Sequence, residues 1–284
     1  MIRLENLSVG YKVGGHERIL MSRLNMSIST GEVTALLGAN GRGKSTLLRT
    51  ISALQSPLDG RVLIDGKDVA ACSTAELARL LTIVTGHSDG AGAFTVEELV
   101  RLGRQPYTGF FGRLSDRDRA IVAEAMAMVG VSHLASRHVA TLSDGERQKA
   151  MIAKAIAQQT PVIILDEPTA FLDVANRLEL LMLLRDISHS QHKAVLMSIH
   201  DVSSVMPIAD QLWLVVPTAT SHAPSTPGSH IPVGSHPGAT ATPESEILSG
   251  SPAELIASDA MQHLFPDRPI SFDPLRGDFL PSHP

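Results

Sequence analysis

The sequence predicts an α/β fold built on a mostly parallel sheet. Three short apolar runs, at 33–37, 162–165 and 194–198, are typical of strands that are buried on both faces. Segments with apolar residues at helical spacing follow two of them, at 46–54 and 174–190. Strands that alternate with helices imply parallel pairing. The 284 residues, 43% of them hydrophobic, suffice for one large domain or for a core with a small subdomain.

Further elements are expected in the first half of the chain. Residues 2–9 alternate loosely between apolar and polar, which predicts a strand at the edge of a sheet, and 61–66 predicts a strand with a turn. Thr95 and Ser115 each have an acidic residue three positions later, which is typical of helix starts. Residues 95 to about 135 are therefore expected to be mostly helical and to form a subdomain.

A segment of different composition lies nearer the C-terminus. Residues 217–245 are rich in proline, serine and threonine and contain no large aromatic residue. This composition predicts a disordered insertion between expected strands at 212–216 and 247–248. The spacing of its histidines fits no compact metal site, so we interpret them as part of a solvated loop.

The overall composition narrows the possible partners and location. A net charge of −5 and a pI near 6.2 argue against a general nucleic-acid surface, so no nucleic-acid partner is expected. The single cysteine, Cys72, cannot form an intrachain disulfide, which fits a reducing compartment. No N-terminal run resembles a signal peptide, and none approaches the ~18 apolar residues of a membrane span. We therefore expect a soluble chain unless a partner holds it at a membrane.

A glycine-rich run at 38–45 is the first sign of chemistry. It fits the pattern G-x-x-x-x-G-K-[ST] and lies between an expected strand and an expected helix. Its backbone N–H groups can point at phosphate oxygens, and the helix dipole adds to this attraction. Lys44 would place a positive charge near the β- and γ-phosphates, and the Ser45 hydroxyl could ligate Mg²⁺. The residues expected to contact nucleotide are Gly38, Ala39, Asn40, Gly41, Arg42, Gly43, Lys44, Ser45 and Thr46.

Two acidic residues follow the apolar run at 162–165. Asp166 is expected at the mouth of a buried strand, where a carboxylate is well placed to hold the Mg²⁺ shell. Glu167 could polarise the attacking water as a general base. A solvated acid at a strand end is the alternative for Glu167, and the phosphate loop elsewhere in the chain favours catalysis.

The run Leu142-Ser143-Asp144-Gly145-Glu146 narrows how the nucleotide would be used. Ser143 is a good N-cap, and Glu146 can complete a capping box with it. Together with the phosphate loop and the acidic pair, the run resembles the LSGGQ signature of ATP-binding cassette (ABC) ATPases, the nucleotide-hydrolysing subunits of ABC transporters. The resemblance implies a P-loop NTPase fold with a mostly parallel core sheet, an N-terminal antiparallel β part and a helical subdomain at about 87–158. It also implies a single domain over 1–284.

The resemblance further implies two copies that close around ATP and Mg²⁺. Ser143 and Gly145 of one copy would cap the γ-phosphate on the phosphate loop of the other. Tyr11 resembles the aromatic residue that stacks on adenine, Asp173 the aspartate that contacts the opposing subunit, and His200 the switch histidine that touches the γ-phosphate. An ordinary strand aromatic is the alternative for Tyr11, a helix cap for Ser143, and a structural or solvated side chain for His200. The implied catalytic residues are Lys44, Glu167 and His200, and the implied Mg²⁺ ligands are Ser45 and Asp166.

Two positions depart from the family pattern. Gly86 occupies the position at which the family has a glutamine. Thr85, His87, Asp89 or a water could substitute for it, and we hypothesise that Thr85 or Asp89 partly replaces the lost side chain. Asp144 stands where the signature has a glycine. Its carboxylate should weaken closure around the triphosphate unless a cation or a tilt of the side chain offsets it.

Two segments indicate the kind of transporter. Residues 103–107 resemble the GRxP segment of importers for iron–siderophore, haem and vitamin B12, and 250–255 resemble their C-terminal tail. The implied function is to energise uptake of ferric siderophore, or of haem or cobalamin. The implied partners are a second copy of the chain, a polytopic membrane permease and an extracytoplasmic substrate-binding protein, at the cytoplasmic face of the cell membrane. A soluble or regulatory ABC-type ATPase that is not coupled to a permease is the alternative.

Overall fold

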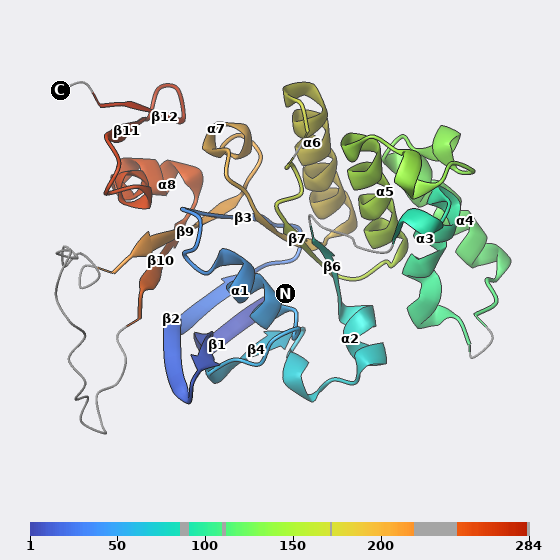
Figure 1. Cartoon of the computed structure of the whole chain (residues 1–284), viewed down its shortest axis with the longest axis horizontal. Coiled ribbons are helices and arrows are strands. Elements are labelled where there is room, and N and C mark those ends of the chain that lie inside the picture. The colour runs from blue at the N-terminus through green and yellow to red at the C-terminus, as the bar shows by residue number, and fades with distance from the viewer. Residues whose placement is uncertain (86–90, 110–111, 171, 219–242, 283–284) are drawn as a thin grey trace.

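A six-stranded sheet forms the centre of the molecule (Figure 1). The computed structural model describes residues 1–85, 91–109, 112–170, 172–218 and 243–282. The strand order is β10-β9-β3-β8-β7-β6, and all neighbours pair in parallel except β10 with β9. The predicted core sheet is therefore confirmed. Its strands are β3 (Val33–Gly38), β6 (Leu81–Thr85), β7 (Val162–Asp166), β8 (Ala194–Ser198), β9 (Gln211–Pro217) and β10 (Ser245–Gly250).

A second, antiparallel sheet is formed by the N-terminal part of the chain. Its order is β2-β1-β4-β5, with β1 at Ile2–Val13, β2 at His16–Ile28, β4 at Asp59–Ile64 and β5 at Lys67–Asp68. The expectation that the first strand lies at an edge is wrong, because β1 pairs with both β2 and β4. Sequence periodicity missed β2, since the β1–β2 register shifts at several points and Arg23 has a left-handed φ of 54°. These irregularities break the alternation that marks a strand.

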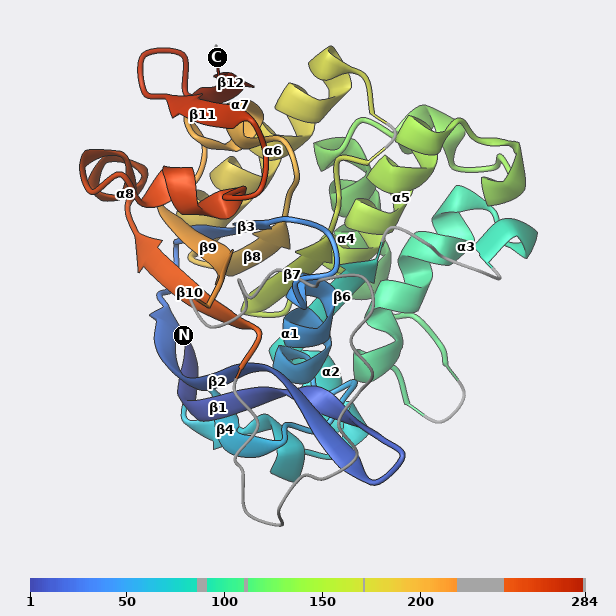
Figure 2. The same ribbon diagram turned by 60° about the vertical axis from the view of Figure 1, so that its left-hand side comes forward.

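Helix α1 (Lys44–Ile51) lies between the two sheets (Figure 2). Leu47, Leu48 and Ile51 are fully buried in one apolar cluster with residues of both sheets, such as Leu4 of β1 and Leu196 of β8. Burial of this kind contributes about 1.5–3 kcal/mol for each large side chain. The helix that follows the glycine-rich run is thus fixed on two sides.

A helical region flanks the sheet next to β6 (Figure 1). Its principal helices are α3 (Val96–Arg101), α4 (Asp116–Met128) and α5 (Asp144–Ala157), with the 3₁₀ helix η3 (Leu102–Tyr107) after α3. Short 3₁₀ turns η2 (Ala91–Ala93), η4 (Ser132–Leu134) and η5 (Val139–Thr141) connect them. Thr95, Ser115 and Ser143 each form the expected capping box, so the predicted helix starts are confirmed.

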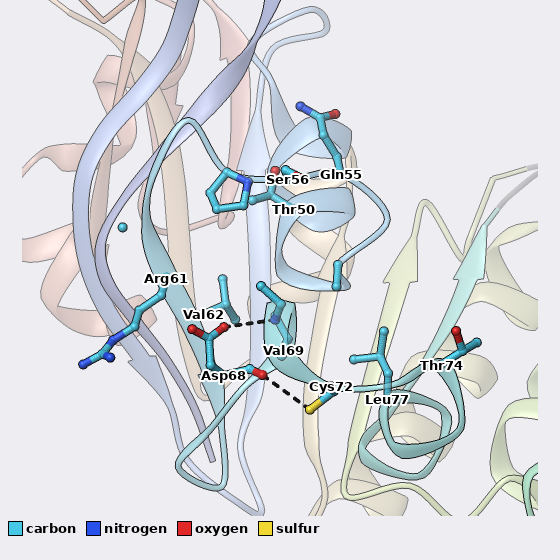
Figure 3. Close-up of a pocket in the computed structure, with 14 residues that line it drawn as sticks. Thr50, Gln55, Ser56, Arg61, Val62, Asp68, Val69, Cys72, Thr74 and Leu77 are labelled. Atoms are coloured by element: carbon cyan, nitrogen blue, oxygen red, sulfur yellow. Dashed lines mark hydrogen bonds between the residues drawn. The ribbon is translucent and has the colours of Figure 1, made fainter.

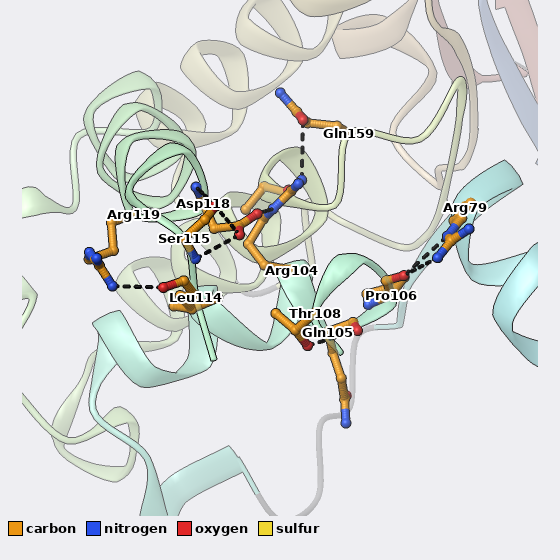
Figure 4. Close-up of polar contacts among 11 residues, drawn as sticks. Arg79, Arg104, Gln105, Pro106, Thr108, Leu114, Ser115, Asp118, Arg119 and Gln159 are labelled. Carbon is orange, nitrogen blue, oxygen red and sulfur yellow. Dashed lines mark hydrogen bonds and ion pairs between the residues drawn. The ribbon is translucent and has the colours of Figure 1, made fainter. Parts of the chain in front are cut away.

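A buried ion pair holds this helical region together (Figure 4). The Arg104 side chain on η3 is 5% exposed; it donates from Nε to Asp118 of α4 at 2.9 Å and from Nη1 to the Ala157 carbonyl at 2.8 Å. Its guanidinium carbon lies 4.1 Å from the ring centre of Tyr107. Arg79 of α2 (Thr74–Leu80) donates to the Pro106 carbonyl at 2.8 and 3.0 Å, which ties η3 to α2.

The C-terminal part completes the fold. Helix α6 (Val174–Gln191) packs on the core sheet, and α7 (Val202–Val205) follows β8. After β10 come α8 (Pro252–Ala257), η7 (Ala260–Leu264) and a hairpin of β11 (Ile270–Asp273) and β12 (Asp278–Pro281). β9 and β10 are the strands expected on either side of the insertion, of which residues 219–242 lie outside the described ranges. In the described residues, no helix is both long and apolar enough to cross a membrane.

Candidate nucleotide-binding site

The carboxyl ends of four parallel strands meet at one edge of the core sheet. Leu36 of β3, Ser198 of β8, Asp166 of β7 and Thr85 of β6 lie side by side in the ladder. The glycine-rich loop leaves β3 just beyond this row, Glu167 leaves β7 and His200 follows β8. In a parallel sheet this is the edge at which ligands bind.

The glycine-rich loop has a backbone that other residues could not easily adopt. A Cβ atom on Gly38 would lie 2.8 Å from the Val215 carbonyl oxygen, and Gly43 has a φ of 92°. Of the α-helices in the described ranges, α1 alone begins without a side-chain cap. Its first N–H groups are therefore left for an anion, as expected for a phosphate site.

Lys44 is a buried cation that has no carboxylate in direct contact among the residues that the structure describes. It is 6% exposed, and its Nζ donates to the carbonyls of Gly38 at 2.6 Å and Ala39 at 3.2 Å. Burial lowers the pKa of Lys44, while the carboxylates of Glu167 and Asp166 act in the opposite direction. A polyanion placed on the loop would offset the desolvation of this ammonium group.

Ser198 organises the two acidic residues, a role that the sequence interpretation missed. Its hydroxyl donates to Asp166 Oδ1 at 2.6 Å and accepts the backbone N–H of Glu167 at 2.9 Å. Glu167 has a left-handed φ of 53°, which costs about 1–2 kcal/mol for a residue with a Cβ atom. The bond from its N–H to Ser198 helps to hold the turn that aims its side chain. The only sequence signal was a polar residue ending an otherwise apolar strand.

His200 and Glu167 form a hydrogen-bonded pair. His200 Nε2 lies 2.6 Å from Glu167 Oε1, and both side chains are partly exposed. The residue after His200 is also fixed, because Asp201 caps α7 and forms an ion pair with Arg177 of α6. The structure thus brings together two residues that are 33 positions apart in the chain.

An open hollow of about 370 Å³ collects most of the predicted nucleotide contacts. Its volume falls in the range of small-molecule sites. It is lined by Tyr11, Leu20, Asn40, Gly41, Gly43, Lys44, Ser45, Thr46, Glu167 and His200. Asp166 does not line the hollow but ends β7 in the strand row, and the Arg42 guanidinium lies 4.0 Å from the Asp267 carboxylate.

The predicted signature residues lie outside this hollow. Ser143 caps α5, and its hydroxyl and backbone N–H both reach the Glu146 carboxylate, at 3.0 and 2.8 Å. These hydrogen bonds lower the pKa of Glu146. Asp144 forms an ion pair with Arg147, one turn later in the same helix. The cation that the sequence reasoning required to offset Asp144 is therefore present.

Asp173 lies near the signature rather than in the hollow. It caps α6 by accepting the Asn176 backbone N–H at 2.8 Å, and this bond lowers the pKa of Asp173. A Cβ atom on Gly145 would lie 3.2 Å from Leu172, so the two segments are neighbours. Lys149 also bonds Asn176 at 3.0 Å across α5 and α6. Ser143, Gly145 and Asp173 therefore belong to a second surface of the chain.

A different hollow opens between the end of α1 and the N-terminal sheet (Figure 3). It has a volume of about 280 Å³ and contains none of the predicted site residues. Asp68 and Cys72 in its wall are bonded internally, Asp68 to the Ala70 N–H and the thiol to the Asp68 carbonyl. The hollow at the phosphate loop, rather than this one, matches the chemistry predicted from the sequence.

Of the residues at and near the position of the missing glutamine, the structure describes Thr85. Gly86, His87 and Asp89 lie outside the described residues. Thr85 ends β6 directly beside Asp166 in the ladder. Among the described residues, no cluster of three or more His, Cys, Asp or Glu side chains forms a ready-made metal site.

Comparison with known proteins decides the family. The sequence pattern of the family described as ABC transporter matches residues 21–170. An uncharacterized ABC transporter ATP-binding protein of Methanocaldococcus jannaschii is 40% identical over 215 residues, 76% of this chain and 73% of that protein. The chain belongs to the ABC transporter family. The ABC ATPase fold predicted from the sequence, with its antiparallel sheet, mostly parallel core and helical subdomain, is confirmed.

Other ABC proteins are similar over most of the chain. The iron(3+)-hydroxamate import ATP-binding protein of Bacillus subtilis is 40% identical over 70% of this chain and 72% of its own length. A metal-chelate type ABC transporter in an inward-facing conformation has a TM-score of 0.72 at 25% identity, over 98% of this chain and 94% of that one. A dimeric ATP-binding cassette with ADP and Pi has a TM-score of 0.67 at 27% identity, over 75% and 93%.

Proposed function

We propose that this ABC protein is the ATP-hydrolysing subunit of an importer for iron chelates or cobalamin. Its relatives include the achromobactin transport ATP-binding protein of Dickeya dadantii, at 38% identity, and the cobalamin import ATP-binding protein of Halobacterium salinarum, at 41%. Ferric siderophore is our first choice of cargo, and haem remains a prediction from the sequence. The chain would act at the cytoplasmic face of the cell membrane, with a permease and an extracytoplasmic substrate-binding protein.

The observation that carries the proposed hydrolysis is the shared hollow of Lys44, Glu167 and His200. An uncapped helix and a desolvated ammonium group favour a triphosphate, and a carboxylate–imidazole pair lies across from them. Glu167 would accept a proton from the attacking water, and His200 would keep the carboxylate oriented and touch the γ-phosphate. When nucleotide binds, the Lys44 ammonium group would exchange its hydrogen bonds to the Gly38 and Ala39 carbonyls for bonds to phosphate oxygens.

The donor set suits Mg²⁺ held jointly by protein and nucleotide. Magnesium is usually held by one or two carboxylates plus substrate phosphates, and bound there it would neutralise charge on the transferring phosphoryl group. Ser45 and Asp166 are the proposed ligands; the bond from Ser198 fixes the orientation of the Asp166 carboxylate.

A second copy of the chain would complete each site. Ser143 and Gly145 lie on a surface apart from the hollow of their own chain, next to Asp173. In the proposed arrangement, Ser143 and Gly145 of one copy contact the nucleotide on the phosphate loop of the other copy. Asp173 would lie at the contact between the two copies. Tyr11, which lines the hollow, would stack on the adenine base.

Replacing Glu167 by glutamine tests the proposed hydrolysis. The change keeps the shape of the side chain but removes the proton acceptor, so we expect turnover to fall at least 100-fold while ATP affinity stays within about threefold. Steady-state phosphate release and calorimetric titration measure the two quantities. Full turnover in this variant would remove Glu167 from its role.

Replacing Thr85 by alanine tests the hypothesis on the missing glutamine. Thr85 lies beside Asp166 in the sheet, where a hydroxyl could reach the shell of the metal. We expect the Mg²⁺ concentration for half-maximal ATPase activity to rise roughly threefold, as for the loss of one weak hydrogen bond. If the Thr85→Ala/Asp89→Ala variant has unchanged ATP turnover and transport coupling, neither residue replaces the glutamine.

Reconstitution with the permease separates the proposed function from its alternative. ATPase activity that rises when the permease and the loaded binding protein are added, in vesicles that accumulate the ferric chelate, supports the importer. An ATPase rate that does not change when the permease is added supports a soluble or regulatory ATPase.

A further inference from the structure

Tyr11, which lines the hollow at the phosphate loop, forms a cluster with two residues from other parts of the chain, Arg18 and Glu244. Tyr11 and Arg18 lie directly opposite each other on β1 and β2, so their side chains share one face of the sheet. The Arg18 guanidinium carbon lies 5.6 Å from the centre of the Tyr11 ring. Arg18 thereby covers part of the ring that is proposed to hold adenine.

Glu244 holds the guanidinium group in this place. Arg18 donates to the Glu244 carboxylate from Nε at 2.6 Å and from Nη2 at 3.0 Å. Two parallel bonds of this kind fix the plane of the guanidinium group as well as its position. Hydrogen bonding to the carboxylate also raises the pKa of Arg18 above its already high ordinary value.

The backbone around Glu244 is itself anchored beside β2. The Glu244 N–H donates to the Ile19 carbonyl at 3.2 Å, and the Thr218 N–H donates to the Glu244 carbonyl at 3.2 Å. The carboxylate is thus delivered from the start of β10 to a fixed point on the N-terminal sheet. Arg18 Nη1 donates to no acceptor within the described part of the chain.

We propose that Arg18, clamped by Glu244, is a nucleobase-binding residue of the ATP site. Its guanidinium group fixes the Tyr11 ring for stacking and presents Nη1 to a ring nitrogen of the purine. The inference rests on the proposed function, because it needs the base of ATP to lie at Tyr11. It adds a contact that comes from a different strand and depends on a carboxylate more than two hundred positions away in the chain.

The chemistry favours this arrangement over a simple surface ion pair. A guanidinium group near an aromatic ring is attracted by the ring quadrupole, and this attraction holds the group beside the ring on which the base would stack. Each purine ring nitrogen with a free lone pair accepts an N–H bond. A triphosphate without a base would make none of these contacts.

Titration calorimetry with two ligands tests the proposal. A non-hydrolysable ATP analogue carries the base, and tripolyphosphate does not. We expect Arg18→Ala to weaken binding of the analogue roughly threefold to tenfold and to leave the affinity for tripolyphosphate unchanged. This is the effect of losing one exposed cation–π contact and one hydrogen bond. Glu244→Gln should weaken binding of the analogue about twofold to fivefold. The affinity of Arg18→Lys for the analogue should lie between those of wild type and Arg18→Ala.

A matched control is available on the same sheet. Arg61 forms an exposed ion pair with Glu5 at 2.8 Å but, unlike Arg18, contacts no aromatic ring in the described part of the chain, so Arg61→Ala should leave the affinity for both ligands unchanged. Tyr11→Ala should lose affinity for the analogue alone. If Tyr11→Ala shows this loss and Arg18→Ala does not, the inference is wrong and the proposed nucleotide site stands. If neither variant discriminates between the ligands, the proposed position of the base is wrong as well.

Discussion

At the scale of single residues, Ser198 is the least expected part of the site. One hydroxyl accepts the N–H of Glu167 and donates to Asp166, so it fixes both the proposed base and the proposed metal ligand. A purely apolar strand end would leave the Glu167 N–H without this acceptor and Asp166 free to rotate. The serine is buried completely, so water could not easily replace its hydroxyl.

Replacing Ser198 by alanine should slow catalysis more than it weakens binding. The lost bonds leave Glu167 and Asp166 misaligned, and we expect the turnover number to fall roughly tenfold with little change in ATP affinity. Phosphate-release kinetics measure this. Ser188→Ala is the control, because Ser188 is equally buried and bonds the Lys193 carbonyl away from the site. Equal effects of the two changes would assign Ser198 a role in folding alone.

At the scale of elements, the ion pair of Arg104 and Asp118 joins η3 to α4 where both are buried. The Ser115 hydroxyl, foremost, and the Arg104 guanidinium lower the pKa of Asp118 to about 2. A depressed carboxyl pKa means that the stabilisation is complete above the unfolded pKa, near 4, and is lost as the pH falls through about 2. Removing one partner from such a pair leaves an uncompensated buried charge, which costs about 3–5 kcal/mol.

Replacing Asp118 by asparagine should therefore destabilise the protein in a pH-dependent way. We expect a lower free energy of unfolding than wild type at pH 7, with a difference that shrinks between about pH 4 and pH 2 as wild-type Asp118 is protonated. Urea unfolding at several pH values measures the difference. Asp116→Asn is the control, because Asp116 is 98% exposed in its pair with Arg119 and should have almost no effect. A difference that does not change with pH would contradict the assignment to Asp118.

Sequence patterns predicted elements best where one local cause decides them. The capping boxes at Thr95, Ser115 and Ser143 and the apolar strands of the core were predictable, because neighbouring residues determine them. The phosphate loop was predictable for the same reason. Strand β2 was not, since its bulges hide the alternation, and neither were the roles of Ser198 and Arg104, whose partners are distant in the chain.

At the scale of the whole molecule, charge near the signature decides how two copies can meet. Asp144 and Glu146 each have a cationic partner, Arg147 in the same helix and Arg137 at 3.6 Å. The surface proposed to face a triphosphate is therefore less acidic than its sequence indicates. These pairs are exposed, so salt will weaken the compensation.

Replacing Arg147 by alanine should impair ATP-driven dimerisation. The uncompensated Asp144 carboxylate would then repel the triphosphate, and we expect the dimer dissociation constant to rise roughly fivefold in the Glu167→Gln background at low salt. Sedimentation with ATP measures it. Asp144→Gly/Arg147→Ala should restore dimerisation, because it removes both charges. If the double variant is as impaired as Arg147→Ala, Arg147 acts by another route than neutralising Asp144.

Because β9 and β10 form an antiparallel ladder, the chain should tolerate a cut or an insertion in the segment that joins them. Six residue pairs, from Ser245–Pro217 to Gly250–Leu212, hold the two strands together independently of what joins them. The Glu244 bonds to β2 add to this attachment. A peptide-bond cut or a guest domain between residues 218 and 243 would leave all these contacts in place. We therefore expect that two separately produced pieces, ending and starting there, can reassemble into an active ATPase, and that a reporter protein spliced in at this point is tolerated.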